Sequence, residues 1–424
     1  MSYISNVGGK LTVTAKGNIK SYAKENIEIN SAKAISVKGV KKGVSFGKPE
    51  HAPIPATLAK CVVEYRPSKD WKGEFGIDWP RKADSKMAVD INYNGIIGKY
   101  GKIYATQKGA VFTPDNKLYS KHLNEYSSFN SYMGKYYVPN LTLIEGETAY
   151  LDAITEVKVS PDKLHYAHDE SIFQLTILKK LTSTKGKHFD EKAVSIKCLK
   201  KFTQKQTIRI IATVGLYMEK VGEICILPND KVKDVNILFI PVEYGKFPKT
   251  TIVGNELQIT KNSLKQAYIN PLVKKFPTPI KLGSLWFDWF FTSKGKDGST
   301  KMDTSDYQSI HRYLDNKFFE NKTNQIYKNY YRVYMLPNSE KLNGMAENIG
   351  KNSRVVVVYQ GRNDSTSPHE LMHAMGLYHT FDNNGLYTYK LQNTDNIMDY
   401  THQIGKSRFS VNRWQWKILN PQVL

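Results

Sequence analysis

The chain has 424 residues, of which 40% are hydrophobic and 24% charged, and its formal net charge at pH 7 is +22. This composition excludes intrinsic disorder, and the length predicts roughly two to four domains. No window holds the ~18 consecutive apolar residues of a membrane-spanning helix, so a membrane protein is not expected. The lysines are scattered without a long basic block, which argues against specific nucleic-acid binding and for a solvated basic surface.

The first residues show neither the basic stretch nor the apolar run of a cleavable signal peptide. If the protein leaves its cell, we expect a route that reads no cleavable N-terminal signal, or a signal that has been removed. Cys61, Cys198 and Cys225 are far apart and form no CxxC pair. They are predicted to be buried free thiols, not a disulfide framework or a thiolate metal site.

An eight-residue repeat occupies residues 10–38, where apolar residues recur at Leu11, Ile19, Ile27 and Ile35. A second, mostly apolar position follows two places later in each unit, which is the alternation of a β-strand. Units this short bury no core of their own, so they must stack as rungs or share a core with other chains. We therefore expect a β stem over residues 1–45, with a plain β-meander packed on the next domain as the alternative.

In period and texture the repeat resembles the β-helical or β-prism stems of phage tail spikes and of type VI secretion spike-tip proteins. Three chains intertwine in those stems. The resemblance implies that residues 1–45 dock on spike or tube proteins of a secretion device, or form a trimer of the chain itself.

The next stretches predict a linker and then β structure. Residues 46–57 are proline-rich and read as the linker. Residues 58–155 are rich in Tyr, Val, Ile and Gly and predict a β-sandwich-like module, with strands over 60–65 and 87–92. A second β-rich module is expected over 156–229. Neither module shows a pattern of catalytic residues, so binding or spacing is their expected use.

From residue 230 the pattern changes to strands mixed with helices, as in an α/β or α+β domain. The apolar run 235–242 predicts a buried strand, and 355–359 predicts a central strand that leads into the next motif. The remaining predicted elements are strands over 280–291 and 331–336 and helices over 263–275, 305–320 and 410–419.

Residues 369–379 read His-Glu-Leu-Met-His-Ala-Met-Gly-Leu-Tyr-His. His369 and His373 are four apart, so on a helix both imidazoles face one side and can bind one cation. Gly376 lets the backbone leave the helix through a left-handed conformation, and His379 can then return as a third ligand. Three neutral imidazoles leave a tetrahedral Zn²⁺ one open position for water. The other nitrogen of each ring is expected to meet an acceptor.

Glu370, beside the first ligand, is placed to take a proton from that water and pass it to the leaving amine. Five fixed positions of this kind match by accident in such a chain on the order of 10⁻⁵ times. A structural alternative treats Ser367, Pro368 and Glu370 as a helix start, with an N-cap, a first-turn proline and a capping-box partner. That alternative leaves the three histidines unexplained.

The motif and the sequence after it resemble the metzincin family of zinc peptidases, whose signature is the extended histidine string. In Asn396-Ile-Met-Asp-Tyr400, Met398 matches the methionine of the turn beneath the zinc. Family members with a tyrosine two places later use it as a ligand or as a donor to the oxyanion, and Tyr400 matches. Two positions depart from the family: Asn396 replaces the usual small residue, and Thr380 fits no subfamily pattern. The resemblance implies a metzincin-like catalytic domain over 230–424.

Together these patterns predict a multidomain protein with a docking stem, two β-rich modules and a C-terminal zinc endopeptidase that acts on a protein or peptide. The arrangement resembles a toxin or effector that a bacterial contractile, type VI-like secretion system loads in the cytoplasm and delivers outside or into a target cell. Such a toxin would also have an immunity protein as a partner. The alternative is a structural spike or adhesin component whose zinc site only stabilises the fold. A site of that kind needs no carboxylate beside an open coordination position.

Overall fold

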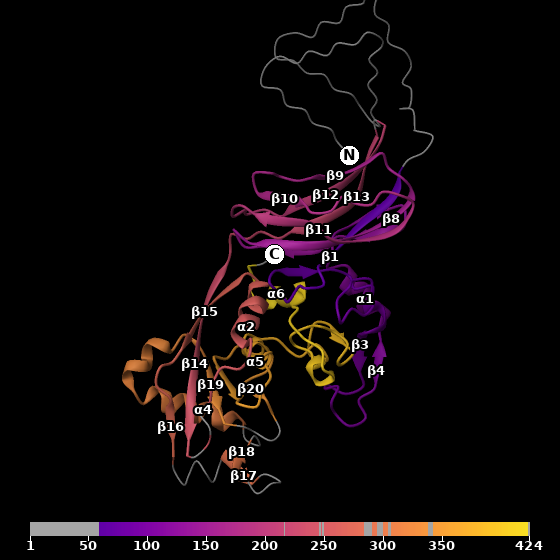
Figure 1. Cartoon of the computed structure of the whole chain (residues 1–424). Helices are drawn as coiled ribbons and strands as arrows, with labels where there is room; N and C mark the ends of the chain where they lie inside the picture. Colours follow the sequence, from indigo (N-terminus) through magenta and orange to yellow (C-terminus); the bar gives the residue numbers. More distant parts are fainter. Residues whose placement is uncertain are drawn as a thin grey trace, which may run out of the picture. The chain divides into compact units, whose positions relative to one another are not determined.

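The computed structural model describes residues 59–422, except 216, 246, 248–249, 284–290, 295–299, 304–306 and 338–341. The predicted stem over 1–45 and linker over 46–57 lie outside the described residues. The described part is built mostly of β-strands in several sheets, with few helices (Figure 1). The expected β-rich architecture is therefore confirmed in outline. None of the described helices combines the length and apolar character needed to cross a membrane.

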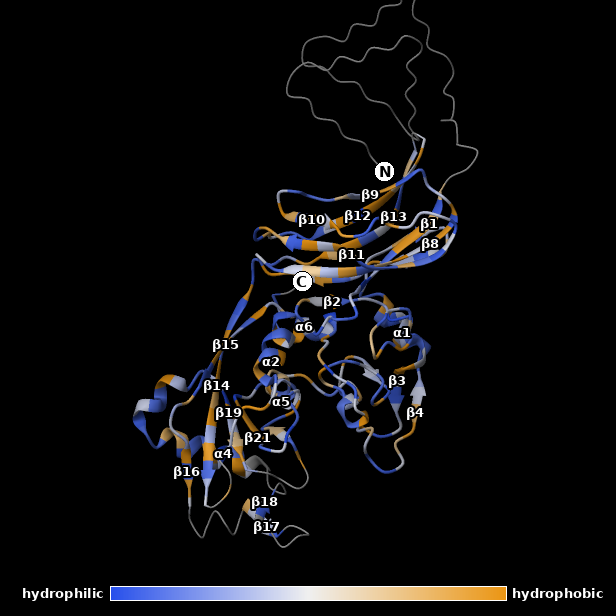
Figure 2. Ribbon diagram, in the orientation of Figure 1, coloured by the Kyte–Doolittle hydropathy of each residue, from blue (hydrophilic) through white to orange (hydrophobic). Residues whose placement is uncertain are grey.

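Two sheets in the first part of the chain share one apolar core. One is antiparallel, in the order β1 (Lys60–Pro67), β8 (Thr148–Val159), β11 (Gly186–Cys198) and β10 (Phe173–Ile177). The other has the order β2 (Gly76–Asp78), β7 (Asn140–Thr142), β13 (Tyr217–Ile226), β12 (Gln206–Val214) and β9 (Lys163–Ala167). Val63, Leu151 and Ile196 of the first sheet belong to the same buried cluster as Ile210 and Ile224 of the second. Apolar segments, orange in Figure 2, run along these strands.

This sandwich corrects the expected division into modules over 58–155 and 156–229. The expected boundary falls inside β8, which pairs with β1 on one side and with β11 on the other. Each of the two sheets therefore contains strands from both ranges. Alternating apolar residues show that a strand exists but not which distant strand it pairs with. The boundary between the two modules therefore could not be predicted from the residue pattern.

The strand predicted over 87–92 is wrong, because this stretch is an irregular loop in the structure. The Asp90 carboxylate accepts a hydrogen bond from the Ser85 backbone N–H at 2.8 Å, and the Ser85 hydroxyl oxygen accepts one from the Met87 N–H. Such local side-chain acceptors compete with the ladder of a sheet. The three cysteines are buried free thiols, as predicted.

The second part contains a mainly parallel sheet with helices on its two faces. Its strand order is β15 (Ile269–Lys275), β14 (Lys233–Tyr244), β19 (Tyr331–Leu336), β21 (Val355–Tyr359) and β20 (Gly344–Ala346), with β16 (Ile280–Leu282) also paired to β14. One face shares a core with α2 (Glu256–Lys265), α5 (Thr366–Ala374) and α6 (Arg413–Leu419), and the other with α4 (Tyr307–Phe319). Of these strands β20 alone is antiparallel to its neighbour, at the end of the sheet.

The helix predicted over 263–275 is also wrong. Helix α2 ends at Lys265, Tyr268 takes a positive φ of 53°, and β15 begins at the next residue. Pro271 lies within β15, where a helix would have been broken. β15 is an edge strand of its sheet. A proline is best tolerated there, because one side of an edge strand makes no ladder hydrogen bonds.

A third unit joins the first third of the chain to its last fifth. β3 (Ile97–Tyr100) pairs with β22 (Thr388–Tyr389) on one side and with β4 (Phe112–Pro114) on the other. A buried cluster there combines Tyr93 with Tyr389 and Trp414. The remaining elements are α1 (Asn116–Leu123), β5 (Ser128–Ser131), β6 (Gly134–Tyr137), β17 (Thr292–Lys294), β18 (Thr300–Met302), and the 3-10 turns η1 (Tyr93–Gly95), η2 (Lys322–Tyr327) and η3 (Thr401–Ile404).

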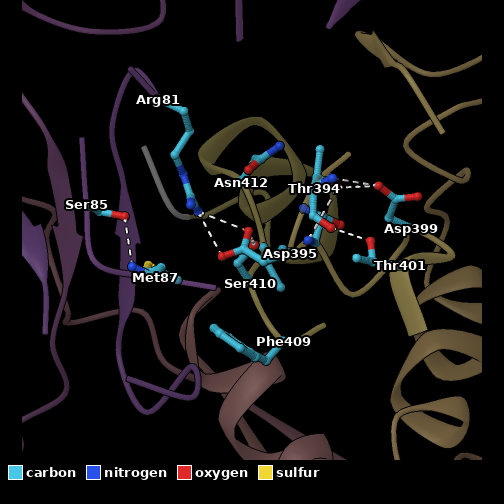
Figure 3. Close-up of polar contacts among 12 residues, drawn as sticks. Arg81, Ser85, Met87, Thr394, Asp395, Asp399, Thr401, Phe409, Ser410 and Asn412 are labelled. Atoms are coloured by element: carbon cyan, nitrogen blue, oxygen red, sulfur yellow. Dashed lines mark hydrogen bonds and ion pairs between the residues drawn. The ribbon is translucent and has the colours of Figure 1, made fainter. Parts of the chain in front are cut away.

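The range 230–424 is thus not a self-contained domain. The Arg81 guanidinium forms an ion pair with the Asp395 carboxylate at 3.1 Å, and both side chains are at most 3% exposed (Figure 3). The Ser410 hydroxyl donates to the same carboxylate, and the Trp79 ring lies 3.6 Å from the guanidinium. This buried pair fastens the N-terminal half to the segment that carries the predicted methionine turn.

We expect Arg81→Ala to lower the free energy of unfolding by about 3–5 kcal/mol, because it leaves a buried carboxylate without its counter-charge. Urea denaturation of the full chain measures this change. Lys317→Ala, which breaks an exposed pair with Glu320, is the matched control and should cost at most about 1 kcal/mol. Equal losses in the two variants would contradict a structural role for the buried pair.

Candidate metal centre

Helix α5 carries the histidine motif and is buried along its whole length. It begins at Thr366, directly after the central strand β21 and a short loop, and its N-cap Ser365 makes no side-chain capping bond. The Ser367 hydroxyl instead donates to the Glu256 carboxylate, so Ser367 does not cap this helix. The helix-start alternative for Ser367 and Glu370 therefore does not describe the helix as it is built.

A buried ion pair holds the start of α5 against α2. The Arg362 guanidinium donates to both oxygens of Glu256 at 2.7 Å, and neither side chain is exposed. Arg362 also donates to the backbone oxygens of Tyr359 and Thr251. The guanidinium and the carboxylate form a bidentate pair, and Arg362 makes further hydrogen bonds to the backbone. The pair is therefore well satisfied and fixes where the helix starts.

The three histidines of the motif converge. The Nε2 atom of His373 lies 3.1 Å from that of His369 and 3.1 Å from that of His379. Gly376 has a φ of 104°, which turns the chain after the helix as predicted and returns His379 to the site. All three side chains are at most 5% exposed. Among the residues that the structure describes, this is the group whose ligand atoms could hold a metal ion.

The protonation of these rings fits a metal ligand set. Burial lowers the pKa of all three, to about 4 for His373, so the imidazoles are neutral. The Nδ1 atoms of His369 and His373 lie 2.8 Å and 2.7 Å from the Ile397 and Leu377 carbonyl oxygens. A carbonyl only accepts, so Nδ1 of His373 carries the proton and its Nε2 presents a lone pair toward the other two rings. Nδ1 of His369 faces both the Ile397 carbonyl and the Arg408 guanidinium.

Lone pairs that face one another at 3.1 Å repel unless a cation lies between them. Tetrahedral zinc with bonds of 2.0–2.1 Å to imidazole would place its ligand nitrogens about 3.3 Å apart, so the donor set fits such an ion. His379 differs from the other two ligands, because no hydrogen-bond partner is found for its buried Nδ1 within the described part of the chain. The expected acceptor is thus present for two rings out of three.

Glu370 is buried in the wall of a cavity that His373 and His379 also line. Burial raises the pKa of this carboxyl to about 7, while Arg408 and the Ala346 backbone N–H act to lower it. A carboxyl with a pKa near neutrality can both accept and return a proton at physiological pH. The position and the pKa of Glu370 therefore suit the general base that the sequence predicts.

The turn around Met398 lies under the histidines. Met398 is fully buried and belongs to the same core cluster as Met372 of α5. The Asn396 side-chain oxygen accepts from the Met398 N–H at 2.9 Å, and its amide donates to Gln415 of α6. The departure at position 396 is explained by this arrangement, since the asparagine closes the turn and ties it to the last helix.

Asp399 closes the rest of this turn. Its carboxylate accepts a hydrogen bond from the Thr394 hydroxyl at 2.7 Å (Figure 3). It also accepts from the Gln392 and Tyr400 backbone N–H groups. The Thr401 hydroxyl donates to the Thr394 carbonyl oxygen. The backbone on both sides of Met398 is therefore held by side chains of the turn itself.

Tyr400 stands beside the histidines, as predicted. Its ring centroid lies 5.0 Å from that of His379 and 5.7 Å from that of His369. It lines the same cavity as Glu370, and burial is the main cause that raises its pKa, so the phenol keeps its proton. A protonated hydroxyl in this position can donate a hydrogen bond into the cavity.

The sequence reasoning missed two residues of the site. Arg408 is 3% exposed; its Nε donates to the Ser365 hydroxyl at 2.8 Å and its Nη1 to the Asp399 carbonyl at 2.6 Å. It ties the start of α5 to the methionine turn, and its Nη1 lies 3.0 Å from Nδ1 of His369. Tyr104 reaches the cavity from the N-terminal half. Neither residue belongs to a local pattern, so no signal in the sequence indicated them.

The site opens into a cavity of about 470 Å³. Its lining residues are Tyr104, Leu342, Gly344, Met345, Ala346, Glu347, Asn348, Ile349, Lys351, Glu370, His373, His379 and Tyr400. The residues of β20, the last strand of the parallel sheet, form part of this lining. Two of the three converging histidines, the Glu370 carboxyl and an edge strand of the sheet thus line one cavity.

Comparison with known proteins gives no family for this chain. No family model matches it, and no curated protein matches it. One solved structure, a putative alpha-galactosidase from Bacteroides fragilis, aligns at 11% identity over 55% of this chain and 44% of that chain, with a TM-score of 0.09. A likeness of this size carries no argument about fold or function.

We expect the protein to bind about one zinc ion per chain and His373→Ala to lose most of it, because the central nitrogen of the three is removed. Metal analysis of the purified, dialysed proteins measures the content. His188→Ala, in the sandwich strand β11, is the control and should bind as the parent does. An unchanged zinc content in His373→Ala would contradict the assignment of the ligands.

Proposed function

We propose that the protein is a zinc-dependent endopeptidase of the metzincin type. The observation that carries the proposal is the convergence of the Nε2 atoms of three neutral histidines, two of which line a cavity together with Glu370. The buried turn at Met398 and the placement of Tyr400 support the same class. The assignment to the metzincin type rests on the resemblance of residues 369–400, because no family model matches the chain.

The residues divide the work of peptide hydrolysis. A zinc ion held by the three histidines would supply Lewis acidity to the water and to the scissile carbonyl. Glu370, which lines the cavity beside the ligand histidines, accepts a proton from the water and returns it to the leaving amine. The Tyr400 hydroxyl donates to the oxygen on which negative charge develops.

The sheet edge suggests how a substrate would lie. β20 pairs with β21 on one side, and its residues Gly344, Met345 and Ala346 line the cavity. An extended peptide can add to the end of a sheet through backbone hydrogen bonds. Because such pairing does not require a chain terminus, it favours cleavage within a chain and a protein or peptide as the substrate.

The alternative is a spike or adhesin component with a stabilising zinc site. Such a site is closed by four protein ligands, whereas this one offers three and adjoins a cavity. We therefore favour the enzyme. We further propose that it is an effector or toxin delivered by a contractile, type VI-like secretion system through residues 1–45, a part of the proposal that rests on the eight-residue repeat.

Glu370→Gln should retain the zinc and the fold but lose peptide hydrolysis by several orders of magnitude, because the proton acceptor is removed while the shape of the side chain is kept. Digestion of denatured protein, followed by mass spectrometry, measures the activity. Glu219→Gln, an exposed change in the sandwich, should cleave as the parent does. Cleavage by Glu370→Gln at the parent rate would refute the mechanism.

Tyr400→Phe should lower kcat by about 10- to 1000-fold and change KM little, because an oxyanion donor acts mainly in the transition state. Steady-state kinetics on one cleaved peptide separates the two parameters. A rise in KM alone would assign Tyr400 to substrate binding.

A further inference from the structure

The loop between β3 and β4, residues 101–111, comes from the N-terminal half yet reaches the metal cavity. It is closed at its base by a hydrogen bond from the Gly101 N–H to the Val111 carbonyl at 3.0 Å. Within it, Tyr104 and Gln107 are joined by two hydrogen bonds, from the Tyr104 N–H to the Gln107 side chain and from the Gln107 N–H to the Tyr104 carbonyl. The loop therefore has a defined shape of its own.

The chain just after the third ligand fastens this loop. The Asn383 side-chain amide donates to the Tyr100 carbonyl at 2.7 Å and to the Lys102 carbonyl at 2.8 Å, and its oxygen accepts from the Tyr100 N–H. The Asn383 backbone N–H donates to the Ile103 carbonyl. Tyr104 in turn forms an isolated bridge with Asp382. The four hydrogen bonds of Asn383, together with this bridge, hold the loop beside the site.

Tyr104 is the lining residue that this loop contributes. Its ring meets the His379 ring edge to face, with centroids 6.2 Å apart. The Tyr104 hydroxyl acts to lower the pKa of the buried Asp382 carboxyl. The aromatic ring of Tyr104 itself adds apolar surface to the lining of the cavity.

Other residues in the lining of the cavity add apolar surface to that of the Tyr104 ring. Leu342, Met345 and Ile349 line it as well, and they come from the stretch that contains β20. A peptide that pairs with β20 would have alternate side chains pointing away from the strand plane, toward one or the other side. A large apolar side chain in this cavity would bury its surface against the Tyr104 ring, whereas Glu347 and Lys351 line the cavity elsewhere.

We propose that Tyr104 contacts the substrate and selects an aromatic or large aliphatic side chain next to the scissile bond, on the His379 side of the cavity. This inference rests on the proposed peptidase function. It assigns a specificity-determining residue to the N-terminal half of the chain, where the sequence shows no catalytic pattern.

A library of proteome-derived peptides, digested by the parent and by variants and sequenced at the cut sites, tests the proposal. The parent should prefer aromatic or large aliphatic residues at one position beside the cleaved bond. Tyr104→Ala should lose that preference and raise KM by about 10-fold or more on a preferred peptide, with kcat little changed. Tyr104→Phe keeps the ring and should keep both the preference and kcat.

The controls separate a lost wall from a lost fold. Val111→Ala lies on the same loop, is 69% exposed in the parent and does not line the cavity, so it should cleave as the parent does. Zinc content and melting temperature are measured for each variant. If Tyr104→Ala fails to fold, Tyr104→Leu keeps the bulk without the ring and should lose the preference for aromatic residues over aliphatic ones.

Three outcomes would overturn the proposal. One is an unchanged preference in a folded, zinc-loaded Tyr104→Ala or Tyr104→Leu. Another is a fall in kcat for Tyr104→Phe as large as for Tyr104→Ala, which would place the hydroxyl in the chemistry and not the ring in a wall. The third is a zinc-loaded parent that cleaves no peptide, in which case the peptidase function fails and this inference falls with it.

Discussion

The close approach of three histidine nitrogens constrains much of the surrounding structure: Nε2 of His373 lies 3.1 Å from Nε2 of each of the other two. The start of α5 is fixed because the Ser367 hydroxyl donates to Glu256, which forms a buried ion pair with Arg362 just before the helix. The helix cannot rotate because its apolar residues share a core with the face of the parallel sheet. The rings cannot turn freely because backbone carbonyls hold two of their Nδ1 atoms. The surrounding structure therefore positions the three rings as a ligand set.

Arg408 shows how the same constraint reaches the turn under the site. It is a buried cation that donates to the start of α5 and to the carbonyl of Asp399, so it connects the helix and the turn at Met398 directly. Its charge also acts on the three histidines and Glu370, lowering the pKa of each. For Glu370 this opposes the larger effect of burial. The pKa of about 7 is thus a balance between desolvation and a nearby positive charge.

What the sequence predicted well depends on short-range geometry. His369 and His373 converge because of helical spacing, and Gly376 turns the chain within the next three residues. The strand over 355–359 was found with its bounds, since a buried parallel strand is apolar throughout. These features need only neighbouring residues, and so a single sequence displays them. The metzincin resemblance itself remains an expectation.

What the sequence could not predict depends on distant partners. Tyr104 lies 275 positions before His379, and nothing in the loop around it has a catalytic pattern. The division of the β region failed for the same reason, because β8 joins β1 and β11 from the two predicted modules. Glu256 lies outside the helix predicted over 263–275, and no local pattern indicated its buried pairing with Arg362. In each case local propensity was silent about a contact that long-range packing makes.

The pairing of Arg81 with Asp395 joins residues 314 positions apart in the chain. Contacts at such separation form late, since the entropy of closing a long loop must be met before the contact contributes. During synthesis on the ribosome, Arg81 emerges long before its partner exists. The methionine turn and the loop of Tyr104 therefore reach their places only when almost the whole chain has been made. An incomplete nascent chain, or a fragment that lacks the last thirty residues, would contain the three ligand histidines. Its metal centre would not be assembled.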